Sequence, residues 1–495
     1  MTRSVLDALD AHAAAQPGAL ALDDVSYAAL RAASLRVAAK LREAGLKPGD
    51  RLAIYAENRP GFVYAYLGGL RAGAIVVTVN VLYRTADLTN ILEDATPSVV
   101  CVSAQSAQFV PADDPRAVID LADVEAWAHD AGITALADPP PIAPDDVAIL
   151  IYTSGTTGRS KGAMLTHGNL GAIGDQLTQA WHWTSADTLL LTLPLFHVHG
   201  LGAGLNGTLV AGGRVLLRER FDAASVVAAL ANGDATMFFG VPTMYVRILE
   251  QAAQSTRFDR VRLFVSGSAA LPATVHEEFA RRFGVSILER YGATEFGFAL
   301  SNRYEGARHA GTVGFALPSV GVRLADENGT DVPAGDAGEI LVDGPNVFKG
   351  YWRNDAATAS AFWHQGGRRW YRSGDLATFD AERGYAINGR LKELVISGGF
   401  NVYPIEVETE LLRVPGIRAA AVVGQPDPAR GEIPVAFVEV DDAFDADAAL
   451  ATLRERLASF KVPKHLYPID ALPRNAMGKV EKPRLRELLR GHPPR

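Results

Sequence analysis

Short apolar runs alternate with amphipathic segments through the first two-thirds of this 495-residue chain. The runs are rich in β-branched residues, and glycine or proline follows most of them, as is typical of buried strands. The expected strands are residues 51–56, 98–103, 147–154, 214–218, 235–240 and 261–267. Alanine-rich stretches such as 30–45 have the spacing of helices with one buried face. The alternation predicts an α/β fold with a substantial parallel sheet.

The pattern changes near residue 390, where a small α+β unit is expected to begin. The segments that indicate it are two expected strands and one amphipathic helix, at 416–424, 433–440 and 445–460. Asp445 or Asp447 is the expected N-cap of that helix. Because the chain is too long for one hydrophobic core, we predict a large domain over 1–390 and a small domain over 391–495.

Composition argues against several classes of function. The net charge of −8 gives no bulk attraction for nucleic acid or an anionic membrane. No apolar stretch approaches the roughly 18 residues that a membrane span needs, and acidic residues interrupt the N-terminal segment. Cys101 is the single cysteine, so no internal disulfide is expected, and its apolar run predicts a core position. We expect a cytoplasmic monomer or homodimer without integral membrane contact.

The segment YTSGTTGRSKG, at Tyr152–Gly162, lies between an expected strand and a helix-like stretch. Its glycines let backbone N–H groups turn toward an anion, its hydroxyls donate hydrogen bonds, and Lys161 supplies positive charge. These features predict a phosphate-binding loop rather than a flexible surface turn. The loop departs from the Walker pattern because position 160 is Ser.

The segment SILERYGATEFG, at residues 286–297, places Arg290 where an expected buried strand stops. A solvated charge needs no such setting, whereas an anion-binding group does. A guanidinium offers a planar pair of donors that matches a carboxylate. The alternative is a salt bridge with Glu289 or another acid.

The phosphate-loop segment resembles that of the adenylate-forming superfamily, which includes acyl-CoA synthetases, luciferases and peptide-synthetase adenylation domains. Other segments resemble that family's motifs in order, namely TLPLFHVHG (192–200), SGSAAL (266–271), RYGATE (290–295), YRSGDLA (371–377), GRLKELVISGGFNVYPIEVE (389–408) and PRNAMGK (473–479). The resemblance implies that a small carboxylic acid attacks the α-phosphorus of ATP and that the thiol of CoA then displaces AMP. ATP, Mg²⁺ and CoA are therefore the expected cofactors.

The resemblance also implies roles for individual residues. Those expected to bind ATP are Thr153, Ser154, Gly155, Thr156, Thr157, Gly158, Lys161, Ser268, Ala269, Tyr291, Thr294, Asp375 and Arg390. Those expected in catalysis are Lys479, His197 and Glu295, the last also as the Mg²⁺ ligand. Those expected at the acid are Arg290, His199, Ser266 and Gly267. A metal site on His197 and His199 is the weaker alternative for that pair.

The small domain is expected to move between the two half-reactions. By the same resemblance, Lys392 is its hinge, and Gly398 and Gly399 line the path of the thiol, where absent side chains allow close approach. Candidates for contacts with the nucleotide of CoA are Arg430, Lys461 and Lys464.

Arg290 also resembles the arginine of malonyl-CoA synthetases, which holds the carboxylate that is not activated. Ala293 departs from those enzymes, which commonly carry Met there, and its small side chain predicts room for a 2-substituted malonate. Alternatives are a short-chain, medium-chain or aromatic monocarboxylate as substrate, a carrier-protein thiol as acceptor, and a non-catalytic nucleotide-binding protein.

Overall fold

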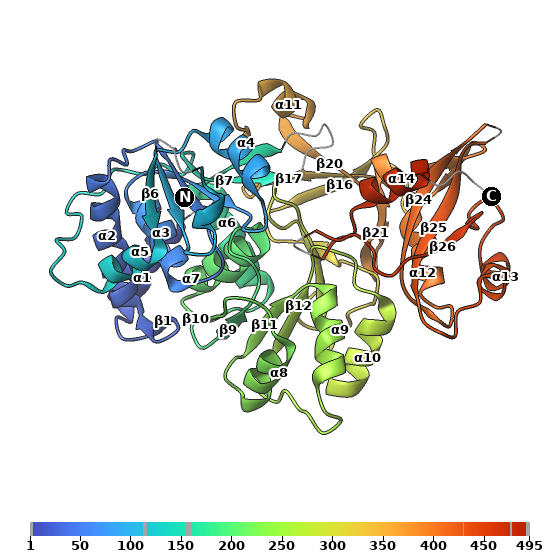
Figure 1. Cartoon of the computed structure of the whole chain (residues 1–495), viewed down its shortest axis with the longest axis horizontal. Coiled ribbons are helices and arrows are strands. Elements are labelled where there is room, and N and C mark those ends of the chain that lie inside the picture. Colours follow the sequence, from blue (N-terminus) through green and yellow to red (C-terminus); the bar gives the residue numbers. More distant parts are fainter. Residues whose placement is uncertain (1–2, 112–115, 154–159, 429, 476–477, 492–495) are drawn as a thin grey trace.

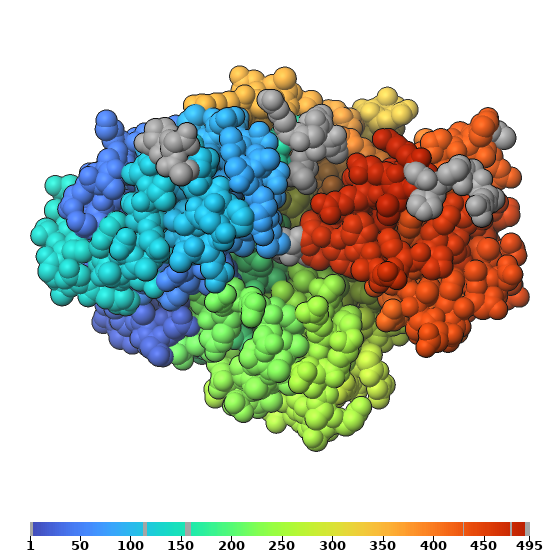
Figure 2. Space-filling model, viewed as in Figure 1, coloured from blue at the N-terminus to red at the C-terminus, as the bar shows by residue number. Residues whose placement is uncertain are grey.

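The computed structural model describes residues 3–111, 116–153, 160–428, 430–475 and 478–491. A large part contains the N-terminal and central sheets, and a smaller part, orange and red in Figure 1, lies beside it. In the space-filling view, the red C-terminal segment lies next to the blue and green surfaces of the large part (Figure 2). The smaller part contacts the large one at Gly478, where an added Cβ would lie 3.2 Å from Thr243 Oγ1.

The first sheet is parallel at its centre and antiparallel at one edge. Its strand order is β18 (Gly350–Tyr351), β8 (Lys161–Thr166), β7 (Val147–Thr153), β4 (Ile75–Val79), β3 (Arg51–Tyr55), β5 (Val99–Val102) and β6 (Ala117–Asp120). The helices that connect its strands are α3 (Pro60–Arg71), α4 (Thr85–Ala95) and α5 (Leu121–His129), while α2 (Tyr27–Glu43) leads into β3. β18 is distant in sequence and adds to the edge formed by the expected phosphate hairpin.

The second sheet carries the expected acid and adenine segments. Its order is β15 (Phe315–Ala316), β14 (Leu300–Ser301), β13 (Leu288–Tyr291), β12 (Leu263–Ser266), β11 (Met237–Gly240), β9 (Thr188–Leu191), β10 (Arg214–Leu217), β1 (Leu20–Leu22) and β2 (Val25–Ser26). Its central strands pair in parallel. Associated helices are α1 (Val5–Ala15), α6 (His167–Ala180), α7 (Gly207–Ala211), α8 (Ala223–Asn232), α9 (Pro242–Gln251) and α10 (Ala273–Phe283). The main core joins residues of both sheets with α6.

An antiparallel sheet follows and leads to the small C-terminal part. It contains β16 (Gly321–Ala325), β17 (Gly338–Asp343), β20 (Arg368–Asp380), β19 (Phe362–Gln365) and β21 (Gly384–Arg390), with α11 (Asp355–Ser360) nearby. A short 3₁₀ turn, η3 (Leu391–Glu393), comes next. The C-terminal elements are β22 (Val395–Ser397), β23 (Phe400–Val402), α12 (Pro404–Leu411), β24 (Ile417–Asp427), β25 (Gly431–Val440), α13 (Ala446–Arg456), β26 (Leu466–Pro468) and α14 (Lys482–Gly491).

These elements confirm the predicted α/β class, with a large part and a small α+β part. The six expected strands correspond to β3, β5, β7, β10, β11 and β12. Asp445 is the N-cap of α13, accepting a hydrogen bond from the backbone N–H of Ala448 at 3.0 Å. Cys101 is buried in β5, and burial raises the pKa of its thiol to about 12. Among the described residues, no helix is both long and apolar enough to cross a membrane.

Candidate active site

β13 ends at a tight turn that only glycine permits. A Cβ on Gly292 would lie 2.0 Å from the carbonyl oxygen of Gly297, so the chain folds back closely on itself. Gly297 has φ +59°, in the left-handed region that glycine tolerates. The turn places Arg290 and Tyr291 on the last residues of a buried strand, with Glu295 shortly beyond them.

Arg290 is a buried cation at this strand end, with 5% of its surface exposed. Its Nε and Nη2 have no hydrogen-bond partner among the described residues. Its guanidinium lies 4.5 Å from the centre of the Phe298 ring. A Cβ on Gly267 would lie 2.3 Å from its Cζ, so this glycine makes room for the guanidinium. Burial lowers the pKa of Arg290 to about 9, and the side chain is still a cation at neutral pH.

Glu289 does not neutralise Arg290 in the described structure. Adjacent residues of a strand point to opposite faces of the sheet. Backbone groups of Leu271 and Gly311 lower the pKa of Glu289, and its Oε1 has no hydrogen-bond partner among the described residues. Burial is the main cause that raises its pKa to about 8, so this acid is largely uncharged near neutral pH. The geometry therefore disfavours the salt-bridge alternative for Arg290 with Glu289.

A polar side chain with an unused hydrogen-bonding atom, His199, lies near Arg290. His199 begins η2 (His199–Asn206), a π-helical segment, and π-helical turns are frequent at functional sites. Its Nδ1 is 3.3 Å from Ser268 Oγ, while its Nε2 has no partner in the described part of the chain. Ser266 Oγ, at the end of β12, is likewise buried without such a partner, but Ser266 pairs with Glu289 and so lies on the face of the sheet opposite Arg290. Of these two residues, His199 is therefore the one whose free ring nitrogen can hydrogen-bond an anion beside Arg290.

The histidines of this region are uncharged at neutral pH. Burial and the nearby positive charge of Arg290 lower the pKa of His197 to about 4 and that of His199 well below its usual value. The backbone N–H of His199 donates to His197 Nδ1 at 3.3 Å. Ser268 has φ +69°, a strained value for a residue other than glycine and typical of functional loops.

On the side of the strand end where nucleotide binding is expected, the charged groups pair with one another. The hydroxyl of Tyr291 donates to Asp375 Oδ2 at 2.6 Å, and Arg390 Nε lies 2.9 Å from Asp375 Oδ1. Asp375 is on β20 and Arg390 is the last residue of β21, which pairs with it. Three residues expected at adenine and ribose are therefore brought together, with both carboxylate oxygens engaged.

Glu295 and Lys161 both lie beside the side chain of Tyr351. Tyr351 donates its hydroxyl to Glu295 Oε1 at 2.9 Å, and Lys161 Nζ lies 5.2 Å from the centre of its ring. Burial raises the pKa of Glu295, and the hydrogen bond from Tyr351 opposes that rise. Thr153 pairs with Lys161 across the β7–β8 hairpin. The expected residues Ser154, Gly155, Thr156, Thr157 and Gly158 lie outside the described part of the chain.

Lys479 reaches this site from the small C-terminal part. It interacts electrostatically with Asp375, Arg390 and Glu393, and burial is the largest of the causes that lower its pKa. A Cβ on the preceding residue, Gly478, would lie 3.2 Å from Thr243 Oγ1 of α9. The loop that carries the lysine is therefore packed against the large part.

Other expected residues lie apart from these groups or at their margin. Gly398 and Gly399 are exposed, with positive φ and open space around their Cα atoms, and Lys392 is exposed within η3. Ala269 is also exposed. Thr294 is buried, whereas Ala293 is half-buried against the main core.

The candidate contacts for the nucleotide of CoA lie in the small C-terminal part. Arg430 accepts a hydrogen bond from the backbone N–H of Gly398 at 2.8 Å through its carbonyl oxygen. Lys461 forms an ion pair with Glu406 at 2.6 Å. Lys464 is exposed. The structure does not bring these cations to the site around Asp375.

Sequence reasoning missed Tyr351 and Phe298. Tyr351 belongs to a two-residue strand, too short for any periodic pattern to reveal. The available signals were a Gly-Tyr pair followed by Trp352 and an apolar FGF run after the Thr-Glu pair. Neither signal indicates by itself that these rings contact Lys161 and Arg290.

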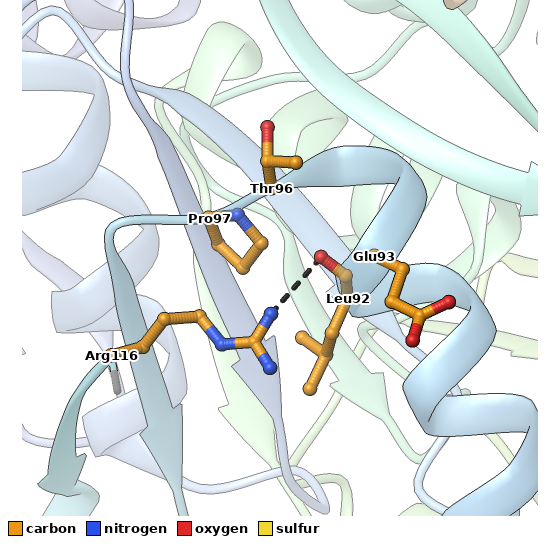
Figure 3. Close-up of a pocket in the computed structure, with 5 residues that line it drawn as sticks. All are labelled: Leu92, Glu93, Thr96, Pro97 and Arg116. Carbon is orange, nitrogen blue, oxygen red and sulfur yellow. Dashed lines mark hydrogen bonds between the residues drawn. The ribbon is translucent and has the colours of Figure 1, made fainter. Parts of the chain in front are cut away.

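Surface hollows lie along α4, away from Arg290. One, of about 410 Å³, is lined by Leu92, Glu93, Thr96, Pro97 and Arg116 (Figure 3). There Arg116 Nη1 donates to the carbonyl oxygen of Leu92 at 3.0 Å, so this cation stabilises the end of the helix. Another hollow, of about 300 Å³, includes Tyr152 and Ser160 at the base of the expected phosphate loop.

Known proteins match this chain over nearly its whole length. A family model described as AMP-binding enzyme matches residues 9–352, and one described as AMP-binding enzyme C-terminal domain matches 406–479. Feruloyl-CoA synthase of an Amycolatopsis species is 39% identical over 469 residues, 93% of each chain. The mitochondrial malonate–CoA ligase of Mus musculus is 34% identical over 486 residues, 89% of this chain and 82% of that one.

A solved structure has the same fold as this chain. The crystal structure of ATP-bound MatB from Rhodopseudomonas palustris superposes with a TM-score of 0.90 at 38% identity, covering 99% of each chain. The fold brings together the described parts of the segments at 152–162, 290–295, 371–377 and 473–479. The chain therefore belongs to the AMP-binding enzyme family, and it is an acid–thiol ligase that uses ATP and CoA to activate a carboxylic acid.

Proposed function

We propose that the enzyme is an acid–CoA ligase for malonate or a small 2-substituted malonate. The observation that carries the proposal is the buried guanidinium of Arg290, whose Nε and Nη2 lack partners among the described residues. Burying a charged group without a compensating partner is costly. An anionic group on the substrate would supply the missing acceptor, and a dicarboxylate retains one such group after its other carboxylate is activated.

The surroundings of Arg290 suit a second carboxylate. The unused donors of the guanidinium can form charge-assisted hydrogen bonds, while His199 Nε2 offers a further hydrogen-bonding atom. The nearby histidines are neutral, so they add hydrogen-bonding atoms without adding charge. Ala293 is small and half-buried, which favours room for a substituent at C2 of malonate. The relative from Mus musculus, a malonate–CoA ligase by its name, supports the same assignment.

The first half-reaction forms the acyl adenylate. A substrate carboxylate oxygen attacks the α-phosphorus of ATP, a P–O bond breaks, and pyrophosphate leaves. We propose that Lys479 places its positive charge beside the oxygens of the carboxylate and the α-phosphate, where negative charge must be balanced. Tyr291, Asp375 and Arg390 would hold adenine and ribose, because a carboxylate can accept hydrogen bonds from both ribose hydroxyls. Thr153 and Lys161 would hold the phosphates.

Glu295 fits a Mg²⁺ site. Mg²⁺ in nucleotide sites is commonly held by one or two carboxylates together with substrate phosphates. The carboxylate of Glu295 is buried, and the Tyr351 hydroxyl orients one of its oxygens. When bound, the ion would neutralise phosphate charge and stabilise the charge on the leaving pyrophosphate.

The second half-reaction transfers the acyl group to CoA. The thiolate sulfur attacks the acyl carbon, and the bond to AMP breaks. We propose that the small domain, residues 391–495, rotates about Lys392 between the half-reactions. This rotation would remove Lys479 from the site and bring the loop at Gly398 and Gly399 to it. Its current position supports this order, because Lys479 is at the nucleotide site while the glycines are exposed.

An aromatic monocarboxylate is the second candidate substrate. The rings of Phe239 and Phe298 lie 6.4 Å and 6.2 Å from that of His199, and the feruloyl-CoA synthase relative acts on an aromatic acid by its name. Such a substrate would stack against these rings, but without a second anion it would leave Arg290 unpaired.

A panel of acids tests the proposal. Thioester formation should be measured with ATP, Mg²⁺ and CoA for malonate, methylmalonate, acetate, butyrate, octanoate, benzoate and ferulate. The proposal predicts the highest kcat/KM for malonate or methylmalonate. A higher value for ferulate or butyrate would overturn it, and transfer only to a carrier-protein thiol would overturn the role of CoA.

A further inference from the structure

Tyr351 occupies a position between the expected phosphate lysine and the expected metal carboxylate. Its side chain is buried, with 8% of the residue exposed. The hydroxyl donates to Glu295 Oε1 at 2.9 Å, while Lys161 Nζ lies 5.2 Å from the ring centre. One side chain therefore contacts two charged groups that arise from different strands and loops.

The backbone around Tyr351 is tied to both of these neighbours. β18 pairs antiparallel with β8, with Tyr351 opposite Ala163, two residues after Lys161. The N–H of Phe348 donates to the carbonyl oxygen of Glu295 at 2.7 Å. The N–H of Trp352 donates to the carbonyl oxygen of Gly162 at 2.8 Å. The segment 348–352 thus fixes the backbone of the two charged residues relative to each other.

The neighbouring residues hold the tyrosine in this orientation. Its backbone N–H donates to Thr358 Oγ1 at 2.9 Å, and its ring lies 4.9 Å from that of Phe348. Successive strand residues point to opposite sides. Trp352 accordingly turns away, and its Nε1 donates to the carbonyl oxygen of Asp94 at 3.2 Å.

We propose that Tyr351 is a positioning residue for the site that binds Mg²⁺ and the ATP phosphates. Its hydroxyl donates a hydrogen bond to one oxygen of Glu295 and so orients the carboxylate, which leaves the other oxygen to bind the metal. Its ring faces the ammonium group of Lys161 and limits where that charge can lie. Groups that orient metal ligands commonly affect metal affinity by 10-fold or more. This inference rests on the roles proposed for Glu295 and Lys161, but not on the identity of the acid.

Nucleotide titration of the full-length enzyme without acid tests the inference. Calorimetry should compare ATP binding with Mg²⁺ and with a chelator for the wild type and for Tyr351→Phe, which keeps the ring and removes the hydroxyl. We expect Tyr351→Phe to weaken MgATP about 10-fold, while metal-free ATP changes by less than about two-fold. Tyr351→Leu, which also removes the ring, should weaken both forms of ATP.

Further variants separate positioning from general stability. Tyr27 is also buried and donates its hydroxyl to the carbonyl oxygen of Gly213 at 2.7 Å, so Tyr27→Phe is a matched control. It should leave binding of both forms unchanged. Equal weakening of both forms by Tyr351→Phe, or no weakening of either, would overturn the inference.

Glu295→Gln separates this inference from the roles on which it rests. If this variant loses MgATP binding while Tyr351→Phe retains it, Tyr351 has no positioning role. If neither variant loses it, the role proposed for Glu295 fails and the inference fails with it. The acid panel remains unaffected by either result, because the titration contains no acid.

Discussion

At the end of β13, the expected nucleotide site and the expected acid site differ in whether their charged groups have partners. On the nucleotide side, Asp375 already has Tyr291 on one oxygen and Arg390 on the other. On the acid side, Arg290 has Nε and Nη2 without partners in the described structure, although the residue is more deeply buried than Arg390. Arg290 lies near the end of β13 and Arg390 at the end of β21, and only Arg390 has an acid as its partner in the described structure.

This difference indicates what each side needs from its ligand. Each oxygen of a carboxylate can accept more than one hydrogen bond, so Asp375 can accept from ribose hydroxyls while it keeps Tyr291 and Arg390 as partners. A buried guanidinium without an acid partner gains a full charge–charge interaction when an anion arrives. We therefore propose that the acid side selects among substrates, so variants of the two sides should differ in whether their effects depend on the acid.

The largest effect is expected from Lys479→Ala, on the nucleotide side. Loss of a positioned cation should slow adenylate formation by about 10²- to 10³-fold, as for other groups that stabilise transition-state charge. Acid-dependent exchange of pyrophosphate into ATP measures this step without CoA. Malonate and butyrate should be affected alike, with Lys464→Ala, an exposed lysine, as control. A loss confined to malonate would assign the lysine to the acid side.

Lys392→Pro should leave the nucleotide and acid sites intact, and it should impair the second half-reaction without the first. Proline fixes φ and removes the backbone N–H in η3, which would obstruct rotation of the small domain. We expect thioester formation from preformed acyl adenylate to fall about 100-fold, whereas pyrophosphate exchange stays near the wild-type rate. Lys392→Ala controls for the side chain. Equal losses in the two half-reactions would contradict the hinge.

Gly267→Ala should impair the acid side selectively. The new Cβ would lie 2.3 Å from Arg290 Cζ, so the guanidinium must move. Because small misplacements of a binding group are costly, kcat/KM for malonate should fall about 10-fold. Butyrate should change by less than about two-fold. Gly18→Ala, at a glycine with open space around it, is the matched control. Similar losses for both acids would indicate a general disturbance of the adenine loop.

Ala293→Met should have the smallest effect and should sharpen the substrate assignment. A longer side chain at this half-buried position would narrow the space proposed for a C2 substituent. The ratio of kcat/KM for methylmalonate over malonate should fall about five-fold, the scale of one or two methyl groups in a pocket. Ala451→Met, exposed on α13, serves as control. An unchanged ratio would show that position 293 does not border the acid.

Much of the fold and the order of the site segments could be predicted from the sequence. Strongly periodic runs such as those in β3 and β7 are local signals, and so is the N-cap at Asp445. The position of Arg290 at a strand end was also predictable, and the alternation of strand residues could have disfavoured its pairing with Glu289 from the start.

The remaining features depend on contacts between distant segments. Tyr351 reaches Glu295 and Lys161 only because β18 adds to β8, a pairing across nearly 200 residues that no short pattern encodes. The π-helical geometry at His199 and the left-handed backbone of Ser268 are likewise set by tertiary packing. The absence of an acid partner for Arg290 within the described residues required the whole site to be assembled.

The ratio of kcat/KM for malonate over that for butyrate, in the wild type and in Arg290→Ala, tests the central claim most directly. Truncating one partner of a buried charge pair costs about 2–5 kcal/mol, so malonate should lose at least about 30-fold. Butyrate should change little, and the ratio should fall accordingly. If malonate and butyrate change by the same factor, Arg290 does not bind the second carboxylate and the account of the acid side is wrong.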